Sequence, residues 1–174
     1  WYRKDLLRKY NFNAPSTWGE IVSQALEILK NEKNNEIKYG FLFQVEDHSD
    51  LNDVFFDFLL ADGCSLINEN NEVAINDELF KETLQFLHDC IYKYKITPDL
   101  SSNIYGGSYK YLEEFIDGKE IFLQHNADLL GNSKIKKDFI DGKIDFYFTP
   151  LGPNGKYYTS RTASRVYVIP TKTR

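Results

Sequence analysis

The sequence contains no methionine and only two cysteines among its 174 residues. Because there is no initiator methionine, we expect a chain that is processed, trimmed or a piece of a longer protein. Two cysteines allow one disulfide at most, and nothing in the sequence brings Cys64 and Cys90 within bonding distance. We therefore expect two free buried thiols, with a disulfide as the open alternative. No CxxC spacing exists and the three histidines are scattered, so no metal site is expected.

Long apolar runs and an excess of positive charge are also missing. No stretch approaches the ~18 apolar residues that cross a bilayer. The opening residues, Trp1–Asp5, lack the apolar segment of an export signal. Lys and Arg total 21 against 26 Asp and Glu, which gives a net charge of -5. This balance argues against nucleic acid or an anionic membrane as a partner.

Aromatic residues, in contrast, are abundant at 16% of the chain. A core of this size needs fewer, so we expect some rings at a surface that contacts something else. Hydrophobic residues make up 42% and charged residues 27%, which is typical of a soluble globular domain. The length fits a single domain that spans residues 1–174.

Helical and extended patterns alternate along the chain. Thr17 and Glu20 form a capping box at the start of an amphipathic helix. A second helix is expected over 51–61 with its stop at Gly63, and a third begins at Asn76 or Asp77. The predicted apolar face of the third helix comprises Leu79, Phe80, Leu84, Leu87, Ile91 and Tyr94. Strands are expected over 39–43, 120–123, 145–148 and 165–169. The alternation favours an α/β fold, a small central sheet with helices on both faces.

A short pattern occurs twice in the second half of the chain. Residues 115–119 read Phe-Ile-Asp-Gly-Lys and lead into the predicted strand 120–123. Residues 139–143 read the same and lead into residues 144–148. Both copies predict a helix, a glycine stop and a strand, one local solution used twice.

Five stretches in this order resemble the second lobe of the family 1 extracellular solute-binding proteins, the maltose-binding-protein-like receptors of ABC importers. Residues 2–7 with 14–20 are similar to the family's "YxKDLL…PxTWxEL" opening, and residues 115–122 resemble its "FxxGKxAM" box. The other three are Tyr39-Gly40-Phe41 with the helix that ends in Ala61-Asp62-Gly63, Leu84–Asp89, and Thr149–Gly155.

The resemblance implies one α/β lobe of a type II periplasmic-binding-protein clamshell, without its partner lobe. It implies a binding protein rather than an enzyme, with a sugar or oligosaccharide as ligand and no cofactor or metal. The implied partners are the missing first lobe and the permease subunits of an ABC importer, and the receptor would be a monomer. The implied location is extracytoplasmic, with or without a lipid anchor.

The resemblance also implies where a sugar would be contacted. In the family, contacts come from the loop after the strand that corresponds to residues 39–43, from the segment after Phe122, and from the end of this part of the chain. The corresponding candidates here are Gln44, Glu46, Asp47, His48 and Asp50, then Gln124, His125 and Asn126, then Ser164 and Arg165. Two tryptophans common in the family are absent from these positions, which argues against a maltose-like ligand. Amide, carboxylate and guanidinium groups beyond strand ends suit a hydroxyl-rich ligand.

Other interpretations of these residues stay open. The carboxylates at 46, 47 and 50 would serve equally to cap the following helix, and Asn126 would serve as an N-cap. Arg165 would serve as a salt-bridge partner. A glycoside-processing enzyme needs two carboxylates across a cleft, which neighbours on one loop seldom provide. A lobe reused as a protein-interaction module would have no small-molecule pocket at all. Trp18 is expected in the core.

Overall fold

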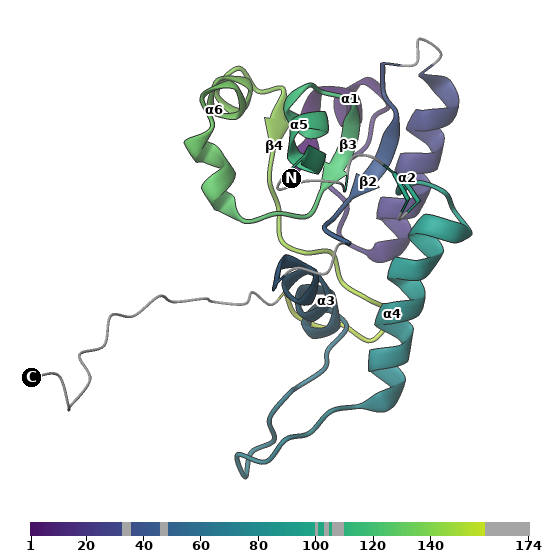
Figure 1. Ribbon diagram of the computed structural model, residues 1–174, viewed down its shortest axis with the longest axis vertical. Helices are drawn as coiled ribbons and strands as arrows, with labels where there is room; N and C mark the ends of the chain where they lie inside the picture. The colour runs from purple at the N-terminus through teal and green to yellow at the C-terminus, as the bar shows by residue number, and fades with distance from the viewer. Residues whose placement is uncertain (33–35, 46–48, 100, 103–104, 106–109, 159–174) are drawn as a thin grey trace, which may run out of the picture.

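The computed structural model describes residues 1–32, 36–45, 49–99, 101–102, 105 and 110–158, with the side chains of 49 and 50 excepted. Helices and strands alternate along this part of the chain, as the sequence predicted (Figure 1). The elements are β1 (Tyr2–Arg3), α1 (Lys4–Lys9), α2 (Trp18–Asn31), β2 (Tyr39–Leu42), α3 (Ser49–Ala61), α4 (Asp77–Tyr92), α5 (Lys110–Ile116), β3 (Glu120–Leu123), the 3-10 helix η2 (Ala127–Gly131), α6 (Ser133–Ile140) and β4 (Ile144–Asp145).

The sheet of the described residues has the strand order β2-β3-β1-β4. Strands β2 and β3 are parallel, with Leu42 beside Leu123, and β1 runs antiparallel to both β3 and β4. The expected strand over 145–148 was placed wrongly, because β4 covers only Ile144–Asp145 and the chain then leaves the sheet. Strand β1 was not expected, and the predicted strand 165–169 lies outside the described residues.

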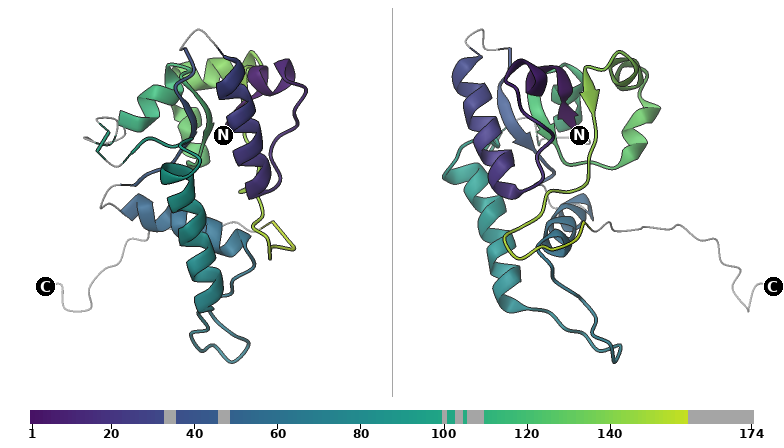
Figure 2. Two further views of the ribbon diagram at one scale, coloured as in Figure 1. Left: turned by 90° about the vertical axis from the view of Figure 1, so that its right-hand side faces the viewer. Right: turned by 180° about the vertical axis from the view of Figure 1, so that it is seen from behind.

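Helices cover both faces of the sheet, as predicted (Figure 2). Along β2, Phe41 points into one buried cluster and Leu42 into the other, as successive strand residues do. The first cluster draws its buried residues from α1, α2, α3 and α4, and the second from α5, η2 and α6. The α/β layered fold follows from this two-sided burial.

Two predicted helix starts are confirmed, and the helix expected over 51–61 begins two residues earlier, at Ser49. The Thr17 hydroxyl accepts a hydrogen bond from the Glu20 amide at 3.2 Å, and the Glu20 side chain returns the capping-box bond. The Asn76 side chain caps α4. Trp18 is buried and stacks on Phe86, with 4.5 Å between ring centroids. The predicted buried face of α4 was partly wrong: Leu84 is 49% exposed. The buried residues are Thr83, Phe86, Leu87 and Cys90, the stripe that faces the aromatic core.

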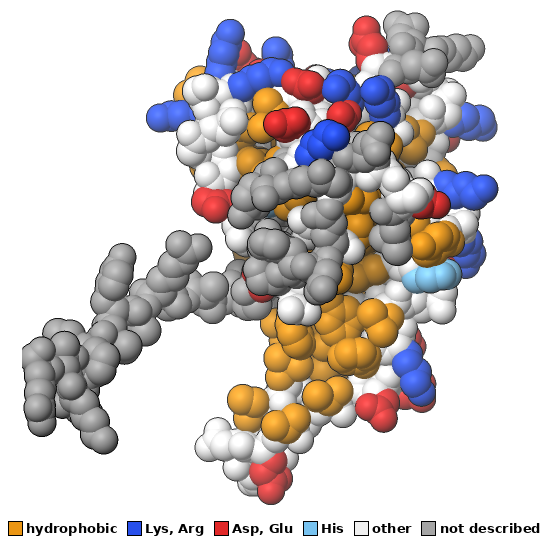
Figure 3. Space-filling model, in the orientation of Figure 1, with side chains coloured by type: hydrophobic (Ala, Val, Ile, Leu, Met, Phe, Trp, Pro, Cys, Tyr) orange, Lys and Arg blue, Asp and Glu red, His pale blue; other side chains and the backbone are white. Residues whose placement is uncertain are grey.

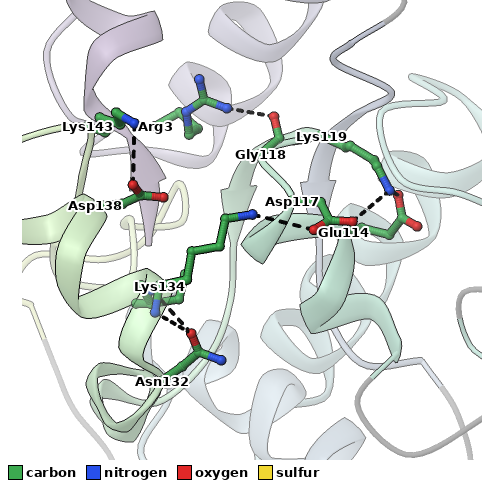
Figure 4. A network of polar contacts seen from close by, with 10 residues as sticks. Arg3, Glu114, Asp117, Gly118, Lys119, Asn132, Lys134, Asp138 and Lys143 are labelled. Carbon is green, nitrogen blue, oxygen red and sulfur yellow. Dashed lines mark hydrogen bonds and ion pairs between the residues drawn. The ribbon is translucent and has the colours of Figure 1, made fainter.

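Both copies of the repeated pattern form a helix, a turn and a strand. Gly118 and Gly142 have φ angles of 76° and 69°, the left-handed conformation that ends each helix. A polar network links the first copy to β1 and to α6, the helix in which the second copy begins, as Figure 4 shows. The Arg3 guanidinium donates to the carbonyl of Gly118 at 2.6 Å, and the Lys134 ammonium of α6 lies 3.5 Å from the Asp117 carboxylate. One local motif therefore builds neighbouring parts of the same end of the lobe.

Cys64 and Cys90 are two separate buried thiols, which agrees with the expectation. Within the described part of the chain, no helix is long and apolar enough to cross a membrane. The same residues contain no group of three potential metal ligands.

Apolar side chains also gather on the surface, over α3 and α4 (Figure 3). The exposed apolar residues of the hairpin between these helices are Ile67, Val73 and Ile75. Phe55 of α3 lies against Phe80 of α4 at 4.6 Å between ring centroids, and both side chains are partly exposed. The lobe thus exposes more apolar surface here than scattered single residues would give.

Candidate functional site

The carboxyl ends of β2 and β3 bring two predicted site segments to one edge of the sheet. The strands are parallel, so the residues that follow them emerge side by side. The backbone N–H of Gln124, directly after β3, donates to the carbonyl of Leu42 at 2.9 Å. Gln44 lies two residues after β2. In open α/β sheets this edge is where ligands bind.

Polar side chains form the floor of the site. The side-chain amide of Gln124 donates to the Asp57 carboxylate of α3 at 2.9 Å. The Gln44 side chain is only 3% exposed, and its oxygen accepts the backbone N–H of Val45 at 2.9 Å. These three residues, with His125 and Asn126, line a small hollow of about 30 Å³, room for a water molecule or a ligand hydroxyl.

An aromatic wall stands beside this floor. A second cavity, of about 210 Å³, shares Asp57 and residues 124–126 with the small hollow and is bounded on its other side by Trp1 and residues 146–148. The Trp1 indole N–H donates to the carbonyl of Asn126 at 3.0 Å, and its ring lies 5.1 Å from that of Phe146. Phe146, Tyr147 and Phe148 are each about half exposed, at 44%, 48% and 56%.

This arrangement suits a small ligand that has many hydroxyl groups and apolar edges. Carboxylate and amide groups offer acceptors and donors for hydroxyls, and aromatic rings pack on the C–H faces of a sugar ring. Nδ1 of His125, which lines the cavity, lies 3.5 Å from the Asp128 carboxylate and 3.3 Å from the carbonyl oxygen of Asn126.

The structure places four of the predicted site residues together: Gln44, Gln124, His125 and Asn126. Asn126 takes the backbone N-cap position of η2 but makes no side-chain capping bond, so the capping interpretation of its side chain is wrong. Glu46, Asp47, His48, Ser164 and Arg165 lie outside the described residues, as does the side chain of Asp50 in the first turn of α3. Their roles stay predictions.

Sequence reasoning missed Asp57 in the polar floor and the aromatic wall of Trp1 and Phe146–Phe148. Two signals were available. Asp53 and Asp57 stand four apart in α3, so their side chains lie on the same face of the helix. Three consecutive aromatic residues before Thr149-Pro150 exceed what one face of a strand buries.

Comparisons with known proteins bear on the fold of the chain. No protein-family model matches the chain. A probable ABC transporter-binding protein of Deinococcus radiodurans is 25% identical over 159 residues, which is 90% of this chain and 37% of that protein. The structure of maltose-bound MalE3 from T. maritima matches with a TM-score of 0.72 and 33% identity, over 89% of this chain and 38% of that one. A solute-binding protein of Agrobacterium radiobacter K84 in complex with ribitol matches over 89% of this chain and 37% of that one, with a TM-score of 0.65 and 19% identity.

The fold and these matches define the chain as an α/β lobe of the type II periplasmic-binding-protein class. The chain spans somewhat more than a third of the length of the relatives it matches. It is similar to a probable ABC transporter-binding protein and to a maltose-bound protein of T. maritima.

Proposed function

We propose that this chain is one ligand-binding lobe of an extracytoplasmic solute-binding protein that delivers a carbohydrate to an ABC importer. The observation that carries the proposal is the joined polar floor and aromatic wall at the carboxyl ends of β2 and β3. Its residues bind and release a solute, and no bond is made or broken. A single α/β lobe over residues 1–174 is part of the same proposal.

The partners in this proposal are a second lobe and the permease subunits of the importer. The apolar surface over α3 and α4 supports a lobe that packs against further parts of a longer protein (Figure 3). A monomeric receptor outside the cytoplasm, free or lipid-anchored, fits the class of its relatives.

The ligand proposed is a sugar or sugar alcohol that is small enough to lie in a shallow cavity. The T. maritima relative is bound to maltose and the A. radiobacter relative to ribitol. The rings available here are Trp1 and Phe146–Phe148, at places different from the family tryptophans that this sequence lacks. We therefore propose a ligand that contacts one aromatic edge beside Gln124, rather than a malto-oligosaccharide between stacked tryptophans.

One lobe offers only half of a clamshell site. Its polar groups stay in contact with bulk water, so each hydrogen bond to the ligand contributes little net free energy. Half of a micromolar binding free energy of about -8 kcal/mol corresponds to a Kd of about 1 mM. The isolated chain is therefore expected to bind its sugar weakly.

The test is an NMR titration of the chain with monosaccharides, disaccharides and sugar alcohols. Shift changes are expected at Gln44, Gln124–Asn126, Trp1 and Phe146–Phe148. Gln124→Ala should abolish them, whereas Gln85→Ala, a matched change of an exposed glutamine on α4, should leave them unchanged. Shifts confined to the opposite end of the lobe would contradict the proposed site, and turnover of aryl glycosides would contradict the binding-protein assignment.

A further inference from the structure

Asp62, just after the end of α3, contacts the turn that contains Asn154, 92 residues further along the chain. Asp62 is fully buried, and one oxygen of its carboxylate accepts the backbone N–H of Asn154 at 2.9 Å. The side-chain amide of Asn154 lies 3.3 and 3.5 Å from the two carboxylate oxygens of Asp62. The same amide donates to the Glu82 carboxylate of α4 at 2.7 Å. These contacts among Asp62, Glu82 and Asn154 are called the Asp62 clamp below.

The backbone approaches so closely here that only glycine fits. A Cβ atom at Gly152 would collide with the Asp62 carboxylate, and one at Gly155 would collide with the carbonyl oxygen of Ala61. The amide of Gly152 donates to that same carbonyl at 3.2 Å. The amide of Gly155 donates to the carbonyl of Gly152 at 3.1 Å and closes the turn. The turn is therefore fitted to the Asp62 carboxylate rather than merely adjacent to it.

The turn is also tied to the start of α2. The amide of Leu151 donates to the carbonyl of Ser16 at 2.8 Å, and the Leu151 carbonyl accepts the amide of Trp18 at 3.0 Å. On the other side, β4 ends at Asp145. Residues 146–150 thus span the distance between two fixed ends. Within the described residues they make no backbone-to-backbone hydrogen bonds of their own.

The aromatic wall of the candidate site lies within this span. Phe146, Tyr147 and Phe148 line the 210 Å³ cavity while they remain about half exposed. Ring contacts fix them only partly: Phe148 stacks on Tyr158, which is itself exposed, at 5.1 Å between centroids. Where these rings sit over the polar floor therefore depends on how firmly both ends of the span are held.

We propose that Asp62 is a positioning residue: through the Asp62 clamp it holds the Gly152–Gly155 turn and so sets the aromatic wall over the cavity. Asp62 does not line the cavity described above. The role in ligand binding rests on the proposed function, whereas the mechanical role does not.

The chemistry of the clamp predicts which substitutions preserve it. Burial raises the pKa of Asp62, the hydrogen bonds from Asn154 oppose that rise, and the nearby Glu82 carboxylate adds to it. A neutral amide in this place keeps an oxygen that accepts from Asn154 and adds an N–H that donates toward Glu82. Asp62→Asn should therefore preserve the clamp, and Asp62→Ala should remove it.

The test compares amide hydrogen exchange and sugar titration in the 174-residue chain and its variants. In Asp62→Ala, exchange at Leu151, Gly152 and Asn154 should rise about tenfold or more, the effect of losing the acceptor of a buried hydrogen bond. Amides of β3 should keep their wild-type exchange. Asp62→Asn should match the wild type at every one of these amides, as should Asp141→Ala, the matched change of an exposed aspartate after α6.

A second, milder variant keeps the test decisive if Asp62→Ala fails to fold. Asn154→Ala removes only an exposed side chain, so the fold survives and exchange should rise at the same amides to a smaller extent. For the sugar that gives the largest shifts in the wild type, Asp62→Ala should weaken binding at least about threefold, the loss of part of one contact. Asp62→Asn should leave the Kd unchanged.

The outcomes separate the two proposals. Unchanged exchange at the turn in both Asp62→Ala and Asn154→Ala, or an equal rise throughout the chain, would overturn the clamp. Failure of Asp62→Asn to match the wild type would overturn its hydrogen-bond basis. A loosened turn with unchanged sugar affinity would overturn the positioning role. If the wild type binds no sugar, the proposed function fails, and the exchange experiment still decides whether the clamp exists.

Discussion

Glu120 provides a sharp test of how burial controls ionisation in this lobe. It begins β3 and is 0% exposed, and neither carboxylate oxygen has a hydrogen-bond partner among the described residues. Burial, and then the Glu114 carboxylate of α5, raise its pKa well above the ordinary value of 4.5, while Lys119 opposes the rise. The phenols of Tyr39 and Tyr105 also face this group, and burial, followed by carboxylate charge, raises the pKa of both.

The direction of the pH dependence follows from that shift. The folded chain holds the proton of Glu120 above pH 4.5, whereas the unfolded chain releases it. The contribution of Glu120 to stability is therefore present at acidic pH and declines as the pH rises from about 4.5 toward the raised folded pKa. One proton gives a slope of about 1.4 kcal/mol of unfolding free energy per pH unit. Because the carboxyl is fully buried, we expect a slope close to this limit.

Glu120→Gln replaces the neutral acid by a neutral amide of the same shape and removes the titration. Urea unfolding of the wild type and of this variant should give similar free energies near pH 4.5. The variant should become the more stable protein as the pH rises above 4.5, by at most about 1.4 kcal/mol per pH unit. Glu113→Gln, a change of an exposed carboxylate on α5, should follow the wild type at every pH. Parallel pH profiles for the wild type and Glu120→Gln would refute the reasoning.

Further predictions concern glycine conformation and the thiols. Alanine at Gly142, where φ is 69° and no atom obstructs a Cβ, should cost about 1–2 kcal/mol of unfolding free energy for the left-handed backbone alone. Alanine at Gly118 should cost more, because its Cβ would also lie 3.0 Å from the Arg3 guanidinium. Alanine at Gly131, where no atom obstructs a Cβ, should leave the unfolding free energy unchanged. Equal effects at all three glycines would contradict this account. Thiol titration should find two reactive groups per unreduced, denatured chain and slow reaction in the folded state, because burial raises the pKa of Cys90. Zero thiols after denaturation would show a disulfide instead.

The sequence by itself determined the features that depend on neighbouring residues. The capping box of Thr17 and Glu20 needs only four consecutive residues, and it is present. The two copies of Phe-Ile-Asp-Gly-Lys each predict a helix, a left-handed glycine and a strand, because these preferences act within one turn of chain. The amphipathic pattern that follows Thr17 likewise predicted α2, and the expected burial of Trp18 is confirmed.

Tertiary structure alone decided the features that depend on pairing between distant segments. Two residues, Tyr2 and Arg3, become a strand only because β3 and β4 flank them on both sides. Leu84 lies exposed because packing against Phe58 and Trp18 selects the Phe86 side of α4. The aromatic wall depends on where the chain leaves the sheet after Asp145 and where the turn meets Asp62. Local sequence patterns do not predict such contacts, because each contact joins segments that are far apart in the sequence.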